Sequence, residues 1–172
     1  IKVLIKVDNE GNEEWRQHIE NTEQSPTGNI QQTTDGGFII AGAPQGGSKN
    51  AFLIKIDSEG NEQWRNQMIM GTHPYQTLRY VTQDVDGGYT MIGGTYSSYS
   101  GDLDNADIIL IKADSNGNKI WEQSLGGLAY DVGYKFIQIS DSEYIIIGLT
   151  QSYGAGSKDG WLIKVSAEII EN

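Results

Sequence analysis

The acidic stretch between two apolar segments is the first place to look for chemistry, because Asp102, Asp104 and Asp107 stand there close together. Closely spaced carboxylate oxygens are ligands that Ca²⁺ takes in proteins. The stretch lacks the central glycine and the distal glutamate of an EF-hand loop. Asp107 also has counterparts at Asn50 and Asp159, which favours a structural role for it. We therefore expect a solvated acidic loop and no cofactor, with a Ca²⁺ site at these three aspartates as the alternative.

Residue types that catalyse reactions are sparse. The chain has no cysteine and two histidines, His18 and His73, and neither has a partner at a spacing that predicts a nucleophile–base pair. Glycoside hydrolysis needs two carboxyl groups about 5–10 Å apart, and the spacing of Asp84, Asp102 and Asp131 selects no pair among them. We therefore expect a protein without enzymatic activity, and keep a carbohydrate-active enzyme as an alternative.

Five tyrosines lie outside the regular apolar segments: Tyr75, Tyr96, Tyr99, Tyr130 and Tyr153. A tyrosine offers a flat apolar ring and a polar tip, which suits it to stack on a sugar or to anchor a protein partner. These five are our candidate ligand-binding residues. The alternative is that they cover the ends of sheets or lie in solvent.

The charge of the chain excludes several classes of partner. Its 172 residues include 12 Lys+Arg and 23 Asp+Glu, which gives a formal net charge of −11. A protein that binds nucleic-acid phosphates needs a basic surface, so we expect no nucleic-acid partner, and adsorption to anionic membranes is disfavoured too. The apolar runs are far shorter than the ~20 residues of a membrane-spanning helix.

The elements that must position these residues are revealed by internal repeats. The segment 4–15, which begins Leu-Ile-Lys-Val-Asp and ends in Trp, recurs at 53–64 and at 110–121, and a fourth copy begins at Leu162. A second block, 35–42, recurs at 86–93 and 141–148. Self-similarity at a fixed period of this size is typical of a repeat architecture.

Each repeat predicts four short strands. They are a strand before the Asp-Gly-Gly turn (78–83 and 134–139), the apolar run after it, a strand over 52–56 and its equivalents, and a fourth that begins near Trp64. These runs are rich in β-formers and bounded by Gly, Asn, Asp and Ser. Tandem four-stranded antiparallel units predict an all-β, β-propeller-type domain of about 3.3 repeats. We place one domain over 1–172, with copies over 1–27, 28–76, 77–131 and 132–172.

The connections between strands divide into two kinds. Those over 43–50, 95–107 and 150–159, and those over 20–28, 70–77 and 126–132, differ between copies, whereas the short turns recur. Because diverged loops carry particular functions on a common scaffold, we expect any binding site on the variable loop face. The recurring lysines 6, 55, 112 and 164 are expected to cover the sheet face, with their amines near Asp8, Asp57 or Asp114.

The spacing Leu53, Asp57, Gly60 and Trp64 resembles the tryptophan-docking motif of quinoprotein-like propellers. The fuller pattern, as in 159–164 and 114–121, is similar to the uncharacterised propeller repeats of bacterial and archaeal secreted or surface proteins. The resemblance implies that Trp15, Trp64 and Trp121 pack between neighbouring blades, and that the protein is extracellular or on the cell surface. It does not imply quinone binding.

About 3.3 repeats are too few to close a propeller, which typically has 4–8 blades. The chain also begins at Ile1 rather than Met. We expect a segment of a longer propeller, and keep two alternatives, pairing with a copy of itself and capping of another chain. Taken together, the sequence predicts a non-enzymatic module that mediates protein or glycan interaction or structural assembly. A lectin, a carbohydrate-active enzyme and a self-assembling subunit remain alternatives.

Overall fold

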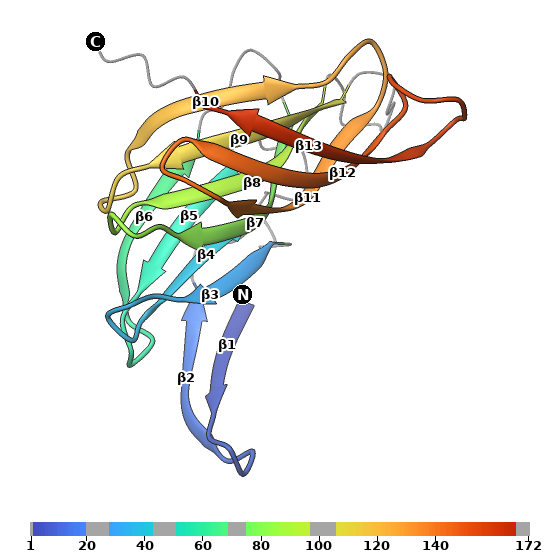
Figure 1. Ribbon diagram of the computed structural model, residues 1–172. Helices are drawn as coiled ribbons and strands as arrows, with labels where there is room; N and C mark the ends of the chain where they lie inside the picture. Colours follow the sequence, from blue (N-terminus) through green and yellow to red (C-terminus); the bar gives the residue numbers. More distant parts are fainter. Residues whose placement is uncertain (1, 20–27, 43–50, 69–74, 97–105, 168–172) are drawn as a thin grey trace.

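The structure is a computed structural model that describes residues 2–19, 28–42, 51–68, 75–96 and 106–167. Within these ranges all regular secondary structure is β-strand (Figure 1). The strands are β1 (Lys2–Val7), β2 (Glu13–Ile19), β3 (Asn29–Gln32), β4 (Phe38–Gly42), β5 (Ala51–Ile56), β6 (Glu62–Met68), β7 (Tyr75–Gln83), β8 (Tyr89–Tyr96), β9 (Ala106–Ala113), β10 (Lys119–Leu125), β11 (Asp131–Gln138), β12 (Glu143–Thr150) and β13 (Asp159–Ser166).

These strands form four antiparallel sheets in which every neighbour in space is also a neighbour in sequence. Sheet one is β1–β2, sheet two is β3–β6, sheet three is β7–β10 and sheet four is β11–β13. Figure 1 shows the sheets following one another as a fan from the N-terminus to the C-terminus. The prediction of an all-β fold with propeller-type blades is confirmed, and the described sheets form an arc that does not close.

The turn between the third and fourth strand of each repeat is held by its first aspartate. Oδ1 of Asp57 accepts the N–H groups of Glu59 and Asn61 at 2.9 and 2.8 Å, and its Oδ2 accepts the Asn61 amide at 3.0 Å. Gly60 adopts φ +88°, a left-handed conformation that glycine takes at little cost. Asp8 and Asp114 make the same bonds in their own turns.

Because these aspartates are already bonded, the predicted lysine partners are wrong. Nζ of Lys55 instead donates to Asp35 at 2.8 Å and to the Ile56 carbonyl at 3.0 Å. Nζ of Lys112 donates to Asp84 and Asp86 at 2.6 and 3.0 Å. Both lysines are buried. Because they lie in the third strand and bond to aspartates in or next to the first turn, they join these two parts of the sheet.

Each tryptophan of the repeated motif lies between two successive sheets. Trp15 donates its indole N–H to the Ser58 carbonyl at 3.0 Å, and its ring meets Phe38 edge-on with centroids 6.2 Å apart. Trp64 packs on Tyr89 at 5.8 Å and Trp121 on Tyr144 at 6.0 Å in the same manner. The indole rings therefore pack between the sheets, as the resemblance of the repeats implied.

The strand boundaries correct part of the predicted loops. The β7–β8 ladder continues to the pair Tyr75 and Tyr96, and β11 already begins at Asp131. All three residues were expected in loops. The ladder extends because the backbone N–H and C=O groups at these positions still find partners across the hairpin, beyond the residues that mark the strand in the sequence.

Candidate functional site

Arg79 on β7 and Tyr134 on β11 occupy equivalent positions in neighbouring sheets, and each lies at a β-bulge. The register of β7 against β8 shifts between Leu78 and Tyr80, so that Arg79 has no partner opposite. The register of β11 against β12 shifts in the same way around Tyr134. A bulge re-aims the side chain that it carries. The Arg79 guanidinium lies 5.7 Å from the centroid of the Tyr134 ring, a cation–π contact that joins sheets three and four.

Glycines within the second strand of sheets three and four allow these bulges. A Cβ at Gly93 would lie 1.7 Å from the carbonyl oxygen of Thr77, and one at Gly148 would lie 2.4 Å from that of Val132. No side chain fits in so close an approach of two backbones. The repeated glycine of the sequence motif therefore sets where Arg79 and Tyr134 point.

Two of the candidate tyrosines complete this cluster. The Tyr96 hydroxyl accepts a hydrogen bond from Nη2 of Arg79 at 3.1 Å, and the rings of Tyr96 and Tyr130 have centroids 6.4 Å apart. Nζ of Lys158 lies 6.0 Å from the centroid of the Tyr130 ring. We call Arg79, Tyr96, Tyr130, Tyr134 and Lys158 the tyrosine–arginine cluster. It collects residues of two sheets and of two connections, 126–130 and 151–158.

The charges of the cluster set what it can bind. Burial, followed by the neighbouring Tyr96, raises the pKa of Tyr130 to about 12, so its phenol keeps the proton at neutral pH and can donate it. Of the three arginines, Arg16 and Arg65 pair with Glu13 and Glu62. Arg79 makes no ion pair within the described residues. It is thus a cation among aromatic rings that can receive a carboxylate.

A buried carboxylate fixes the backbone that carries Tyr130. Asp131 is fully buried and accepts hydrogen bonds from the Thr150 hydroxyl, from the Ser152 hydroxyl at 2.6 Å and from the Gly127 N–H at 2.8 Å. Ser152 also accepts the N–H of Ala129 at 3.0 Å. The segment before β11 is therefore held in place, which pre-organises the ring of Tyr130 for a ligand.

Tyr153 has a different environment from the cluster. Its hydroxyl donates to the Gly126 carbonyl at 3.0 Å, and its ring lies 5.0 Å from that of Trp161 on β13. These contacts tie the β12–β13 connection to the sheet and leave half of the side chain exposed. Tyr153 is thus a structural contact whose side chain also contributes to the surface.

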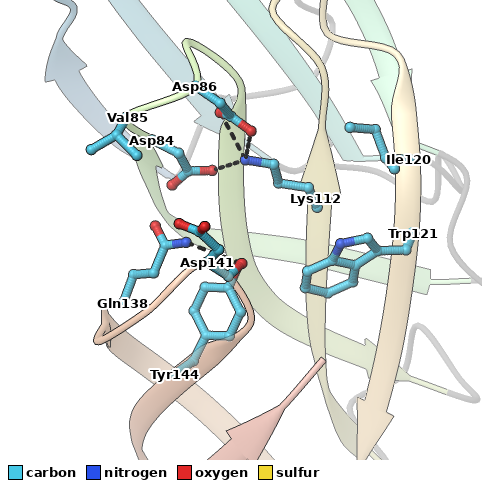
Figure 2. Close-up of a pocket in the computed structure, with 9 residues that line it drawn as sticks. All are labelled: Asp84, Val85, Asp86, Lys112, Ile120, Trp121, Gln138, Asp141 and Tyr144. Atoms are coloured by element: carbon cyan, nitrogen blue, oxygen red, sulfur yellow. Dashed lines mark hydrogen bonds and ion pairs between the residues drawn. The ribbon is translucent and has the colours of Figure 1, made fainter. Parts of the chain in front are cut away.

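A cleft of about 400 Å³ lies at the opposite end of sheets three and four, on the side of the short turns. Figure 2 shows Trp121 and Tyr144 as its aromatic walls, with Asp84, Asp86 and Lys112 beside them. The sequence placed candidate sites on the variable loop face and did not indicate this cleft.

The polar groups of the cleft bond mainly to one another. Burial opposes the charge of Lys112, but hydrogen bonds to Asp84 and Asp86 outweigh it and raise the pKa of the amine. The bond to Lys112 in turn lowers the pKa of Asp86. Asp84 also accepts the Thr90 hydroxyl at 2.7 Å. A lysine held as a cation between two carboxylates is unsuited to act as a base or a nucleophile.

The equivalent place between sheets two and three is bridged by glutamines. The N–H of Thr34 donates to Oε1 of Gln83 at 2.8 Å, and the N–H of Gln83 donates to Oε1 of Gln31 at 3.2 Å. The next glutamine in the repeat, Gln138, donates to the Asp141 carbonyl of its own turn at 3.4 Å, as Gln83 does to the Gly87 carbonyl, but among the described residues it makes no bond to sheet three. The cleft lies where that bridge between sheets is not formed.

The remaining candidate residues are placed only in part. Tyr75 begins β7, and its side chain is outside the described structure, as are Tyr99, Asp102, Asp104 and His73 entirely. Asp107 lies in β9 and is half-buried, and Asp84 and Asp131 lie at opposite ends of the sheets. No group of three metal-ligating side chains occurs among the described residues, so the Ca²⁺ alternative at Asp102, Asp104 and Asp107 stays a prediction.

The sequence missed Arg79, Tyr134 and Lys158. Arg79 and Tyr134 occupy equivalent positions in segments predicted to be regular strands, and Lys158 lies next to the predicted start of a strand. The signal that could have found the first two is the glycine shared by Gly93 and Gly148, since a recurrent glycine within a strand marks a bulge or a close backbone approach.

Comparison with models of known protein families gives no match for this chain, and comparison with curated proteins gives none either. In the part of the chain that the structure describes, no helix has the length and apolarity to cross a membrane.

Proposed function

We propose that this chain is a non-enzymatic interaction module of an exported or surface protein, and that the tyrosine–arginine cluster binds a glycan bearing a carboxylate. The observation that carries the proposal is Arg79, which stands among Tyr96, Tyr130 and Tyr134 without a carboxylate partner in the described structure. Flat rings stack on the apolar faces of sugars, and a guanidinium binds a carboxylate through two parallel hydrogen bonds. The location rests on the resemblance of the repeats.

The buried carboxylates of Asp84 and Asp131 are engaged in hydrogen bonds within the protein, which supports a function without catalysis. Among the described residues, Asp84 and Asp131 are the aspartates with the least exposure. Asp84 bonds to Lys112 and Thr90, and Asp131 bonds to Thr150, Ser152 and Gly127. Each carboxylate already serves the structure around it, and a general acid or base needs access to its substrate.

The test is a glycan array of acidic and neutral oligosaccharides, followed by titration of the best acidic glycan. Arg79→Gln is expected to weaken binding about tenfold to a hundredfold, because it removes a charge-assisted hydrogen bond. Tyr130→Ala is expected to weaken binding as well, by loss of the stacking ring. Arg16→Gln is the matched control, since it removes the same charge from a surface ion pair on β2.

Several results would overturn the proposal. Equal losses with Arg79→Gln and Arg16→Gln would mean that only the overall charge matters. Binding of neutral glycans alone, or of an acidic protein with no glycan, would assign the cluster to another ligand. Turnover of a glycan that is lost when a single carboxylate is changed would make the protein a carbohydrate-active enzyme.

A self-assembling subunit is the second candidate function. The observation that favours it is the pair of exposed apolar sheet faces at the two ends of the arc, where Ile5 is 49% and Leu162 is 72% exposed.

A further inference from the structure

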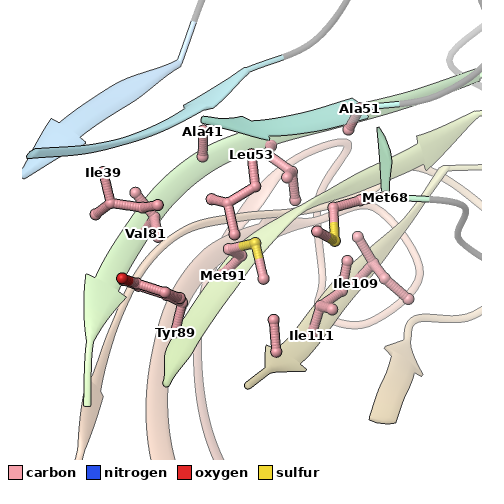
Figure 3. Packing of buried hydrophobic residues seen from close by; sticks show 12 residues of the cluster. Ile39, Ala41, Ala51, Leu53, Met68, Val81, Tyr89, Met91, Ile109 and Ile111 are labelled. Carbon is pink, nitrogen blue, oxygen red and sulfur yellow. The ribbon is translucent and has the colours of Figure 1, made fainter. Parts of the chain in front are cut away.

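The joints between successive sheets follow one pattern of side chains. We call the face that a sheet turns toward the preceding sheet its front face, and the opposite one its back face. On the back of sheet two, Ile39, Ala41 and Leu53 lie in one cluster with Met91 and Ile111 on the front of sheet three (Figure 3). Front and back faces are therefore complementary halves of one type of joint.

The next joint repeats this arrangement. On the back of sheet three, Ile92 and Leu110 pack against Tyr144, Ile146 and Val165 on the front of sheet four. The positions correspond, because Leu110 is the counterpart of Leu53, and Ile146 that of Met91, in the repeat. The joint between sheets one and two is built in the same way, with Leu4 on the back face and Ile40 and Ile54 on the front face.

The back face of sheet four carries the same type of side chains but is exposed. Leu162 is 72% and Ile147 is 56% exposed, whereas their counterparts Leu53 and Ala41 are both at 0%. Ile145, Ile147 and Leu162 line a shallow apolar groove of about 180 Å³ together with Ile137. Apolar surface of this kind is typical of an interaction site.

The front face of sheet one is exposed in the complementary way. Ile5 is 49% and Val7 is 52% exposed, whereas the counterparts Ile54 and Ile56 are at 0% and 1% in the interior of the arc. Val3 extends the same face and is 41% exposed. The molecule thus carries one half of a joint on its first sheet and the other half on its last.

We infer that the front face of sheet one of one copy packs on the back face of sheet four of a second copy, head to tail. The partner is a second copy, since the three internal joints show which side chains cover each face, and the same chain supplies both halves. The inference is independent of glycan binding, because no residue of the tyrosine–arginine cluster is among those that form the front face of sheet one or the back face of sheet four.

The joint has two physical consequences. A head-to-tail contact uses two different surfaces, so it adds copies to form a ring if the rotation closes and a filament if it does not. Each copy carries a net charge of −11, which opposes association by repulsion. Because salt screens that repulsion while apolar burial persists, association is expected to strengthen as the salt concentration rises.

The experiment is analytical ultracentrifugation of the full chain at several concentrations, in low and in high salt. The sedimenting mass is expected to rise with concentration, and more so in high salt. Ile5→Lys and Leu162→Lys are each expected to sediment as monomers when alone. Mixed, they are expected to form a one-to-one complex, because the first keeps an intact back face and the second an intact front face.

Leu128→Lys is the matched control, since Leu128 is 96% exposed in a connection away from both end faces, and it is expected to associate like the unchanged protein. A monomer of the unchanged protein under all conditions would overturn the inference. So would dissociation caused equally by Leu128→Lys, loss of association with only one of the two end-face variants, or failure of the two variants to combine.

Hydrogen exchange of the unchanged protein keeps the inference testable if a variant fails to fold. On concentration, protection is expected to rise in both β1 and β13. A rise at one end alone, or at neither, would contradict a head-to-tail joint.

Discussion

At the scale of residues, the buried lysines show how a repeated position gains its partner from the fold. Lys55 is 4% exposed and pairs with Asp35 of the first turn in its sheet. Lys112 binds two carboxylates at the equivalent place. In sheet four Lys164 pairs with Glu143 and its side chain is 56% exposed. The acid is at the same position in sheets two and three, as Asp35 and Asp86, and Lys112 gains Asp84 in addition. In sheet four the acid lies two residues later in the repeat, at Glu143.

The Asp35–Lys55 pair predicts a pH dependence of stability. The bond to Lys55 lowers the pKa of Asp35 to about 2 from its ordinary 3.8. A lowered pKa in the folded state stabilises it above pH 3.8, and this contribution is lost as the pH falls toward 2. Solvent screening at this half-exposed carboxylate limits the contribution to about 1 kcal/mol. Asp35→Asn should therefore unfold at lower urea concentration at pH 6, and the difference should shrink as the pH falls to 2 and be lost below it.

Asp141→Asn is the matched control for this prediction. Asp141 occupies the equivalent turn position, and it makes no ion pair among the described residues. The difference in free energy of unfolding between Asp141→Asn and the unchanged protein is expected to be the same at the two pH values. A loss in Asp35→Asn that persists undiminished at low pH would show that the pair does not stabilise the fold electrostatically.

At the scale of elements, the hairpin turns dock on the tryptophan of the preceding sheet. A Cβ at Gly117 would lie 2.5 Å from the Trp64 ring, and one at Gly60 would lie 2.9 Å from the Trp15 ring. The equivalent Gly11 has nothing within 4 Å. The same turn thus serves as a local reversal in all three copies, and as a contact between sheets in two of them.

This difference predicts unequal effects of one substitution. Gly11→Ala should destabilise the protein by about 1 kcal/mol, because alanine is strained at the φ of +88° found there. Gly117→Ala, at φ +77°, should destabilise it by roughly 1–3 kcal/mol more, because its methyl group also displaces an indole ring. Chemical denaturation of both variants measures the difference. Equal destabilisation would mean that the turn does not dock on Trp64.

At the scale of the whole molecule, the arc is a stack in which each sheet packs on its neighbours. Sheets two and three are covered on both faces, whereas sheets one and four each have one exposed face. Stability in such a stack is the sum of each unit and of its joints with the neighbours. The ends of the stack should therefore open before the middle.

Hydrogen exchange at low protein concentration tests this order. Amides of β1 are expected to exchange much faster than those of β5, although the two strands carry the same motif, Leu-Ile-Lys followed by Val or Ile. The reason is that β5 is paired on both sides and buried on both faces, whereas β1 pairs with β2 alone among the described strands. Equal exchange in β1 and β5 would contradict a stack whose stability depends on its joints.

What the sequence by itself determined is the repeating part of the protein. The period of the motif, the β-formers and the turn residues predict the strands and their antiparallel order, and the resemblance of the repeats implied that each tryptophan packs between sheets. Local pairing and apolar packing decide these features, and both are written in residue type and spacing. Tyr96 and Tyr130 were also named as candidate binding residues from their types alone.

Only the tertiary structure decided which side chains meet. The bulges at Arg79 and Tyr134, the pairing of Lys55 with Asp35 and the cleft beside Trp121 each depend on contacts between residues far apart in the sequence. A repeated motif specifies the strands of its own sheet, but it does not specify how one sheet packs on the next. The site and the two exposed end faces follow from the packing between sheets and from the order of the sheets.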